Sequence, residues 1–207
     1  VPAGRYAIRI SALREATPVD KGHAAAQLMF DEARKMRTPP NAANRRAMIA
    51  KYRETLPLFE AAGDNYRRSL ALLSIGDTYY RLNEFREALN YFNQTLAFTP
   101  TVADKRLEAG ASNYGGMLDI LADVGKALNQ YQRALKSARE VGWQVGEVNA
   151  LSNIGKIYSD AADWQKALDY YSQALAINKS LGNKRNEALT LNNIGIAYSL
   201  SGEQQKA

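Results

Sequence analysis

The chain has 207 residues, no cysteine and a single histidine, His23, so disulfides, thiol nucleophiles and zinc–thiolate sites are excluded. Its net charge of +6 arises in residues 1–62, which carry 11 Lys and Arg against 6 Asp and Glu, whereas residues 63–207 carry 16 against 15. We interpret the basic excess as solvated helix faces, with a phosphate-binding patch as the alternative, and His23 as an exposed surface residue.

Residues 1–20 are predicted to be extended, because Arg5 to Ile10 alternate as the residues of a strand do. A single strand cannot stand alone, so we expect it to be the last strand of a preceding β domain. Residues 21–64 then form a degenerate helix pair, with one helix from Ala24 to Arg37 and a second over residues 42–62. Terminal repeats of an array are atypical, so we interpret this pair as a cap.

The rest of the chain repeats a single pattern. Four segments align without gaps, and their glycines lie 39, 40 and 40 residues apart: Gly76, Gly115, Gly155 and Gly195. Twelve residues after each glycine stands an alanine, and four residues after the first three alanines stands an aromatic: Ala88, Ala127, Ala167 and Ala207, then Phe92, Tyr131 and Tyr171. The glycine and the alanine mark the close approach of two antiparallel helices, where only a small side chain fits. We therefore expect an all-α fold with helix pairs at residues 65–104, 105–144 and 145–184, and the first helix of a truncated pair at 185–207, beyond which the array continues.

This pattern resembles the tetratricopeptide repeat, and the first copy matches that family at Leu72, Ile75, Gly76, Tyr79, Ala88, Phe92, Thr95 and Pro100. The resemblance implies a right-handed superhelix of antiparallel helix pairs that binds other polypeptides. The long spacing is similar to that of the kinesin-light-chain and Pins-type repeats. The segment Gly4 to Ile10 is similar to the junction between a β domain and tetratricopeptide repeats in large bacterial proteins that often end in a CHAT peptidase domain.

The concave face of such a superhelix is lined by the first helix of each pair. Two residues before the glycines stand Ser74, Asn113, Asn153 and Asn193. An asparagine amide is both donor and acceptor, so a ladder of asparagines can pair with the backbone of an extended peptide. The alternative is that these amides bond to a neighbouring helix and act as spacers. The resemblance implies a peptide-binding ladder, as in the kinesin-light-chain and Pins-like families. The predicted groove residues are Asn113, Asn153, Asn193, Asn192, Asn149, Lys156, Ser152, Asp77 and Tyr80, and further positions of the same register are Leu73, Ser112, Asp119, Ser159 and Ile196.

The sequence shows no catalytic constellation. Gly110 to Gly115 is followed by Gly116 and Met117 where a phosphate loop needs Lys and Ser or Thr. We expect a scaffold that binds an extended peptide or partner protein, with no catalytic residue, cofactor, metal, nucleic acid or membrane involved. The alternative is a regulatory arm that controls an effector domain elsewhere in a larger chain. A homodimer through the edge formed by Leu191 and Tyr198 is a further expectation.

Overall fold

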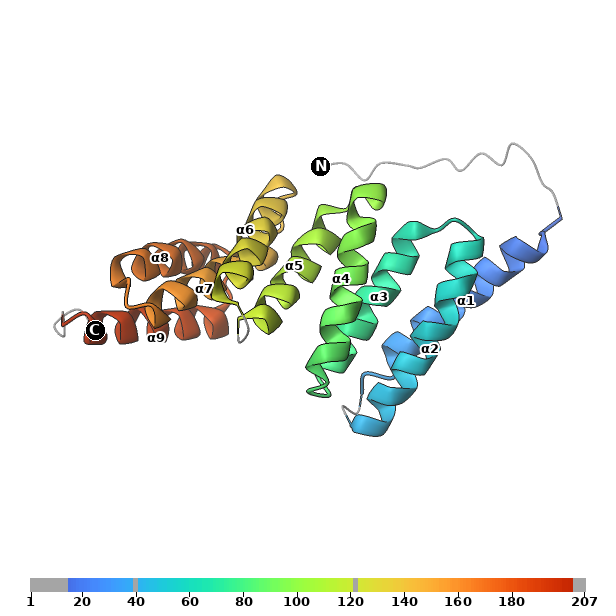
Figure 1. Cartoon of the computed structure of the whole chain (residues 1–207), viewed down its shortest axis with the longest axis horizontal. Helices are drawn as coiled ribbons and strands as arrows, with labels where there is room; N and C mark the ends of the chain where they lie inside the picture. Colours follow the sequence, from blue (N-terminus) through green and yellow to red (C-terminus); the bar gives the residue numbers. More distant parts are fainter. Residues whose placement is uncertain (1–14, 39–40, 121–122, 203–207) are drawn as a thin grey trace.

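The computed structural model describes residues 15–38, 41–120 and 123–202. Within these ranges the chain forms nine α helices and no strand: α1 Pro18–Lys35, α2 Ala42–Ala61, α3 Asn65–Tyr80, α4 Phe85–Val102, α5 Lys105–Asp119, α6 Val124–Glu140, α7 Gln144–Asp160, α8 Trp164–Ser180 and α9 Lys184–Leu200. They follow one another in chain order from one end of an elongated array to the other (Figure 1). The prediction of an all-α fold is confirmed, whereas the strand predicted at Arg5 to Ile10 lies outside the described residues.

The first helix begins earlier than its sequence boundary at residue 21. Thr17 caps it: the Thr17 hydroxyl accepts from the Asp20 backbone N–H at 3.2 Å, and the Asp20 carboxylate accepts from the Thr17 N–H at 2.8 Å. Pro18 fits the first turn, where its missing N–H needs no partner. Residues 18–20, which were expected to be extended, are therefore helical.

Three glycines that follow the ends of α2, α6 and α8 adopt the left-handed conformation typical of a helix end. Gly63, Gly142 and Gly182 have φ values of 67°, 62° and 64°. Ala162 follows α7 at the corresponding place with a φ of 57°, although it has a side chain. This alanine therefore holds a conformation that L residues seldom adopt.

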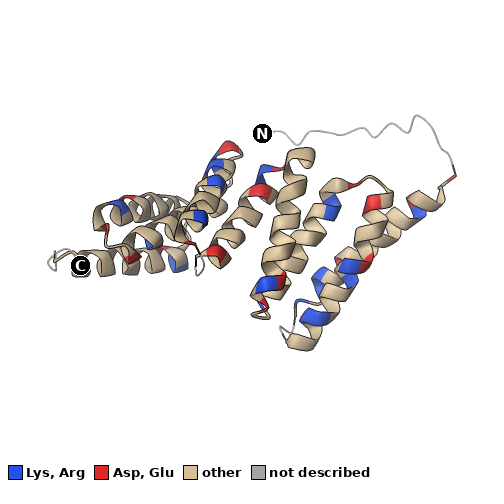
Figure 2. Ribbon diagram, viewed as in Figure 1, with Lys and Arg blue, Asp and Glu red and all other residues tan. Residues whose placement is uncertain are grey.

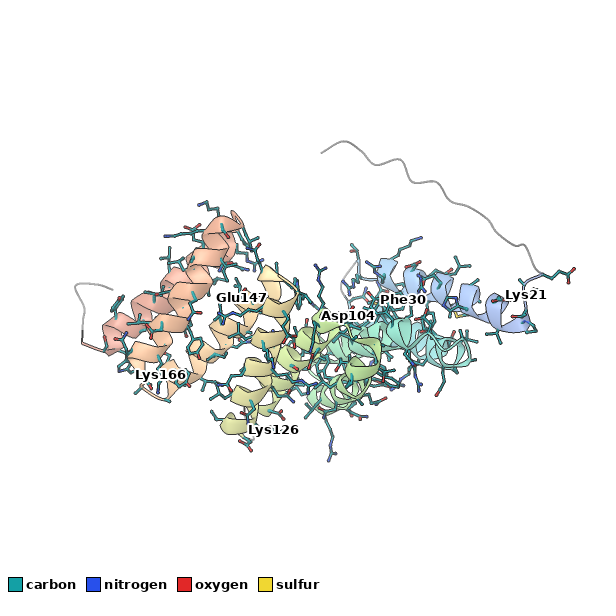
Figure 3. All side chains as sticks on the ribbon, turned by 90° about the horizontal axis from the view of Figure 1, so that it is seen from above. Lys21, Phe30, Asp104, Lys126, Glu147 and Lys166 are labelled. Atoms are coloured by element: carbon teal, nitrogen blue, oxygen red, sulfur yellow. The ribbon has the colours of Figure 1, made fainter. Side chains whose placement is uncertain are left out.

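Each helix packs against the helices before and after it, and α5 also contacts both α3 and α7. The buried side chains form two clusters, one contributed by α1 to α4 and one by α6 to α8; Phe30, labelled in Figure 3, belongs to the first. From α5, Tyr114 and Leu118 pack against the first cluster, and Met117 packs against the second together with the C-cap residue Ile120. Helix α5 thus joins the two halves of the array.

A glycine faces an aromatic ring in each complete pair of the repeat. A methyl group added at Gly76 would lie 2.5 Å from the Phe92 ring, and one added at Gly155 would lie 2.7 Å from the Tyr171 ring. The middle pair departs from the expected register, because Gly116 stands against Tyr131, at 2.8 Å. A methyl group at Gly115 would meet only Gln130, at an ordinary 3.6 Å. The assignment of Gly115 to the close approach was therefore wrong by one residue.

His23 joins the first helix pair to the start of α3 and is not the exposed residue that the sequence predicted. Its Nε2 lies 2.8 Å from Oδ2 of Asp64, the N-cap residue of α3. Its ring meets Phe59 edge-on, with centroids 5.8 Å apart, and 33% of its side chain is exposed. The packing of α2 and α3 covers the rest.

Candidate functional site

A hollow of about 430 Å³ lies where α5 and α7 run side by side. Its lining residues come from α5, from the turn before α7 and from α7: Gly110, Asn113, Tyr114, Met117, Trp143, Asn149, Ser152 and Asn153. We call it the amide hollow, since three of these side chains are asparagines. Four of the predicted groove residues therefore meet here, namely Asn113, Asn149, Ser152 and Asn153.

Two asparagines of the predicted ladder are bonded to each other across the helices. The Asn153 Nδ2 donates to the Asn113 Oδ1 at 3.0 Å, and both side chains are half-buried. This is the contact that the spacer interpretation predicted. It uses one donor of Asn153 and one lone pair of Asn113, so the Asn113 N–H groups and the Asn153 carbonyl retain capacity for another partner.

Trp143 was missed by the sequence reasoning. It is the N-cap residue of α7 and makes no side-chain capping hydrogen bond, whereas Asp64, Asp104 and Asn183 cap α3, α5 and α9. The indole lies directly over Gly146, where an added methyl group would overlap it. A signal was available: an indole cannot accept a capping hydrogen bond, so a tryptophan at a capping position calls for another reason.

Asp77, a predicted groove residue, already has two partners. Its carboxylate accepts from the Arg81 Nε at 2.9 Å and from the Tyr114 hydroxyl at 3.0 Å. Burial raises the pKa of Tyr114 to about 12, and the Asp77 charge adds to the effect, so Tyr114 stays a donor at neutral pH. Tyr80 packs beside it, with ring centroids 5.8 Å apart. Asp77 and Tyr80 therefore both contact Tyr114, which lines the amide hollow.

The other predicted groove residues are not brought to the hollow. Lys156 is exposed and pairs with Asp160 at 2.8 Å, one turn along the same helix. On α9, Asn192 is exposed and Asn193 is half-buried. Ser112 and Asp119, which the register also assigned to the groove, are buried at 0% and 4% exposure, so that assignment was wrong.

Among the described residues, no group of three or more His, Asp and Glu side chains could hold a metal ion. No helix in the same ranges is both long enough and apolar enough to span a bilayer.

Family models described as tetratricopeptide repeat match residues 71–105 and residues 146–207. No curated protein matches the chain significantly in sequence. The fold is an all-helical repeat array, and the two matched segments have the pattern of the tetratricopeptide repeat, whose general role is protein–protein interaction.

Solved structures with a similar fold share little sequence with the chain. BtubC (BKLC) from P. vanneervenii is 18% identical with a TM-score of 0.63, over 92% of this chain and 87% of that one. The MamA protein is 19% identical with a TM-score of 0.63, over 90% and 86%. A signal transduction ATPase with numerous domains (STAND) from Pyrococcus horikoshii, which has a tetratricopeptide repeat sensor, is 16% identical with a TM-score of 0.61, over 91% and 33%. At such identities the likeness establishes the fold.

Proposed function

We propose that the chain is a scaffold that binds an extended segment of a partner protein across α3, α5 and α7. The observation that supports this most directly is the amide hollow, which is lined by the side chains of Asn113, Asn149 and Asn153 together with Trp143. Amide side chains can satisfy the N–H and C=O groups of an extended backbone without reading its side chains. The indole adds a flat apolar surface on which one side chain of the partner packs.

The spacing of the helices suits an extended chain. Packed helices lie about 10 Å apart, and an extended chain advances about 3.3 Å per residue, so each step between first helices corresponds to roughly three residues. The N-cap residues Asp64, Asp104, Trp143 and Asn183 recur at the long interval seen in the sequence. This interval supports an assignment to the long-repeat class of the kinesin-light-chain and Pins-type proteins.

A library of extended peptides tests the proposal. We expect peptides to bind the parent chain and to lose about tenfold or more in affinity on an Asn149→Ala/Asn153→Ala variant, an effect on the order of 1.4 kcal/mol. The matched control is Asn93→Ala/Asn129→Ala, which truncates two exposed asparagines on the second helices α4 and α6. Equal peptide binding by both variants, at unchanged helicity, would show that the asparagines act only as spacers.

A second candidate is a regulatory arm that controls an effector domain, of the CHAT peptidase kind, in a longer chain. The observation that favours it is the similarity in fold to a STAND protein whose repeats are described as a sensor. In that case, peptide binding changes the activity of the attached effector, and the Asn149→Ala/Asn153→Ala variant abolishes the response. An effector that responds equally in both chains would argue against this arrangement.

A further inference from the structure

We propose that the peptide groove continues into an arginine-lined pocket that binds Asp or Glu side chains of the same extended segment. This inference rests on the proposed function and names the chemical class of its partner. The pocket, which we call the arginine pocket, has a volume of about 190 Å³ between the α1–α2 connection and the end of α3. It is lined by Arg37, Arg45, Met48, Asp77, Thr78 and Arg81.

The charges around the arginine pocket do not balance. Its one carboxylate, Asp77, is already bonded to Arg81 and Tyr114. Arg37 and Arg45 make no ion pair with any other residue that the structure describes. Two positive side chains therefore face the pocket without an anionic partner.

A neighbouring hollow extends this positive region. It has a volume of about 470 Å³, shares Arg37 with the arginine pocket, and is further lined by Asp31, Arg34 and Lys35. Figure 2 shows Lys and Arg on α1 and α2 close to the connection between these helices. The two hollows together hold five positive and two negative side chains, which makes a favourable environment for carboxylates.

Helix ends account for only some of these positive charges. Arg34 and Lys35 lie in the last turn of α1, where cations stabilise the helix dipole. Arg45 has the opposite situation, because it lies near the N-terminal end of α2, whose first turn has no acidic residue. The dipole disfavours a cation there. A bound carboxylate would compensate the Arg45 charge at this helix end.

A single hydrogen bond connects the arginine pocket to the amide hollow. Asp77 lines the first, Tyr114 lines the second, and the Tyr114 hydroxyl donates to the Asp77 carboxylate at 3.0 Å. The supporting helices α3, α5 and α7 are in contact in that order. Two helix steps separate Arg81 from Asn153, a distance of about 20 Å, or about six residues of extended chain. The partner should therefore carry its acidic residues about six positions from the part whose backbone meets the amides.

Arginine is suited to this task. Its planar guanidinium can hold a carboxylate with two parallel hydrogen bonds, and it is less strongly hydrated than a lysine ammonium. Because the pocket opens beside the groove, internal Asp or Glu side chains can enter it as readily as the end of a chain.

The direct test uses NMR of the arginine Nε–H groups in the intact chain. We titrate the capped tripeptide acetyl-Glu-Glu-Glu-amide, with acetyl-Gln-Gln-Gln-amide as the neutral control. The Glu peptide should shift the signals of Arg37, Arg45 and Arg81, while leaving that of Arg86, an exposed arginine on α4, unchanged. Absence of these shifts, or equal shifts with the Gln peptide, would overturn the inference.

A binding assay connects the pocket to the groove. Peptides of about a dozen extended residues, with and without a Glu cluster about six residues from the centre, are compared by fluorescence anisotropy. An Arg37→Gln/Arg45→Gln variant should lose about tenfold in affinity for the Glu peptide only, and the loss should shrink at high salt. The charge-matched control, Arg86→Gln/Lys136→Gln, should bind both peptides as the parent does. If both variants lost the same affinity for the Glu peptide, the loss would come from the change in net charge, and the arginine pocket would be refuted.

The two proposals can fail separately. Peptides that bind through the asparagines with no preference for Glu would leave the peptide groove standing and refute the arginine pocket. A Glu tripeptide that shifts the arginine signals, together with no binding of any peptide longer than three residues, would support the pocket and refute the peptide groove. Arginine signals that respond to inorganic phosphate or to an oligonucleotide, and not to the Glu tripeptide, would refute an acidic peptide as the ligand.

Discussion

Two adjacent glycines in α5 should respond differently to the same substitution. Gly115 and Gly116 are both buried within one helix, and in either place alanine raises the intrinsic helix propensity by about 1 kcal/mol. The structure separates them by their surroundings. The new methyl group at position 115 makes ordinary contact with Gln130, whereas at position 116 it overlaps the ring of Tyr131, which is 2% exposed.

The expected magnitudes follow from these contacts. Gly115→Ala should stabilise the chain by about 1 kcal/mol, because nothing opposes the gain in helix propensity. Gly116→Ala makes the same gain but adds an overpacking cost of about 1–3 kcal/mol, since a buried ring cannot move aside freely. The two variants should therefore differ in the free energy of unfolding by about 1–3 kcal/mol, which corresponds to several degrees in melting temperature.

Thermal and urea unfolding followed by circular dichroism would measure this difference, with hydrogen exchange in α5 as a local readout, since repeat arrays need not unfold in a single step. A second substitution, Tyr131→Leu, should remove most of the penalty of Gly116→Ala, so that the two changes are strongly non-additive. If Gly116→Ala proves as stabilising as Gly115→Ala, the ring contact does not constrain this position and the register of the middle pair was misjudged.

Three further substitutions test other parts of the argument. Ala162→Gly should stabilise the chain by about 1 kcal/mol in a melting experiment, because alanine is strained at its positive φ; no gain would mean that the strain is absent. Burial raises the pKa of Glu108, but hydrogen bonds from two cationic side chains outweigh this effect and hold the pKa at about 2, below its usual 4.5. Glu108→Gln should therefore reduce the loss of stability as pH falls from 4.5 towards 2, measured as the urea midpoint at each pH. An unchanged dependence of the urea midpoint on pH would contradict this prediction. Gly146→Ala should displace Trp143 and weaken peptide binding several-fold in the anisotropy assay at unchanged helicity, and unaltered affinity would remove Trp143 from the site.

Much of the fold could be predicted from the sequence because the pattern of residues repeats. The helix expected over residues 42–62 corresponds to α2, at Ala42–Ala61, because Met48 and Tyr52 stand 40 residues before Ala88 and Phe92 of the first full copy. The left-handed ends at Gly142 and Gly182 were likewise predictable, because the constraint lies in the backbone of one residue. Capping by Thr17 and Asp20 was visible in principle but was overlooked, because the alternating residues upstream suggested an extended segment.

The sequence indicated some of the residues that line the amide hollow, and their binding role stays a prediction. The asparagine spacing indicated Asn113 and Asn153, and the structure brings them together with Asn149 and Ser152. The sequence left open whether these amides bond to a neighbouring helix or to a partner. The hydrogen bond between Asn113 and Asn153 depends on the separation of α5 and α7, which no spacing in the sequence specifies.

The sequence by itself determined the all-α class of fold and its repeated character, because these depend on periodic patterns of local interactions. Only the tertiary structure decided that Gly116 replaces Gly115 at the ring, that Asp77 is already occupied by Arg81 and Tyr114, and that Arg37 and Arg45 line one pocket with Asp77 and Arg81. The physical reason is that each of these facts depends on how far apart two helices lie and how they are rotated, and that is set by packing across the whole array.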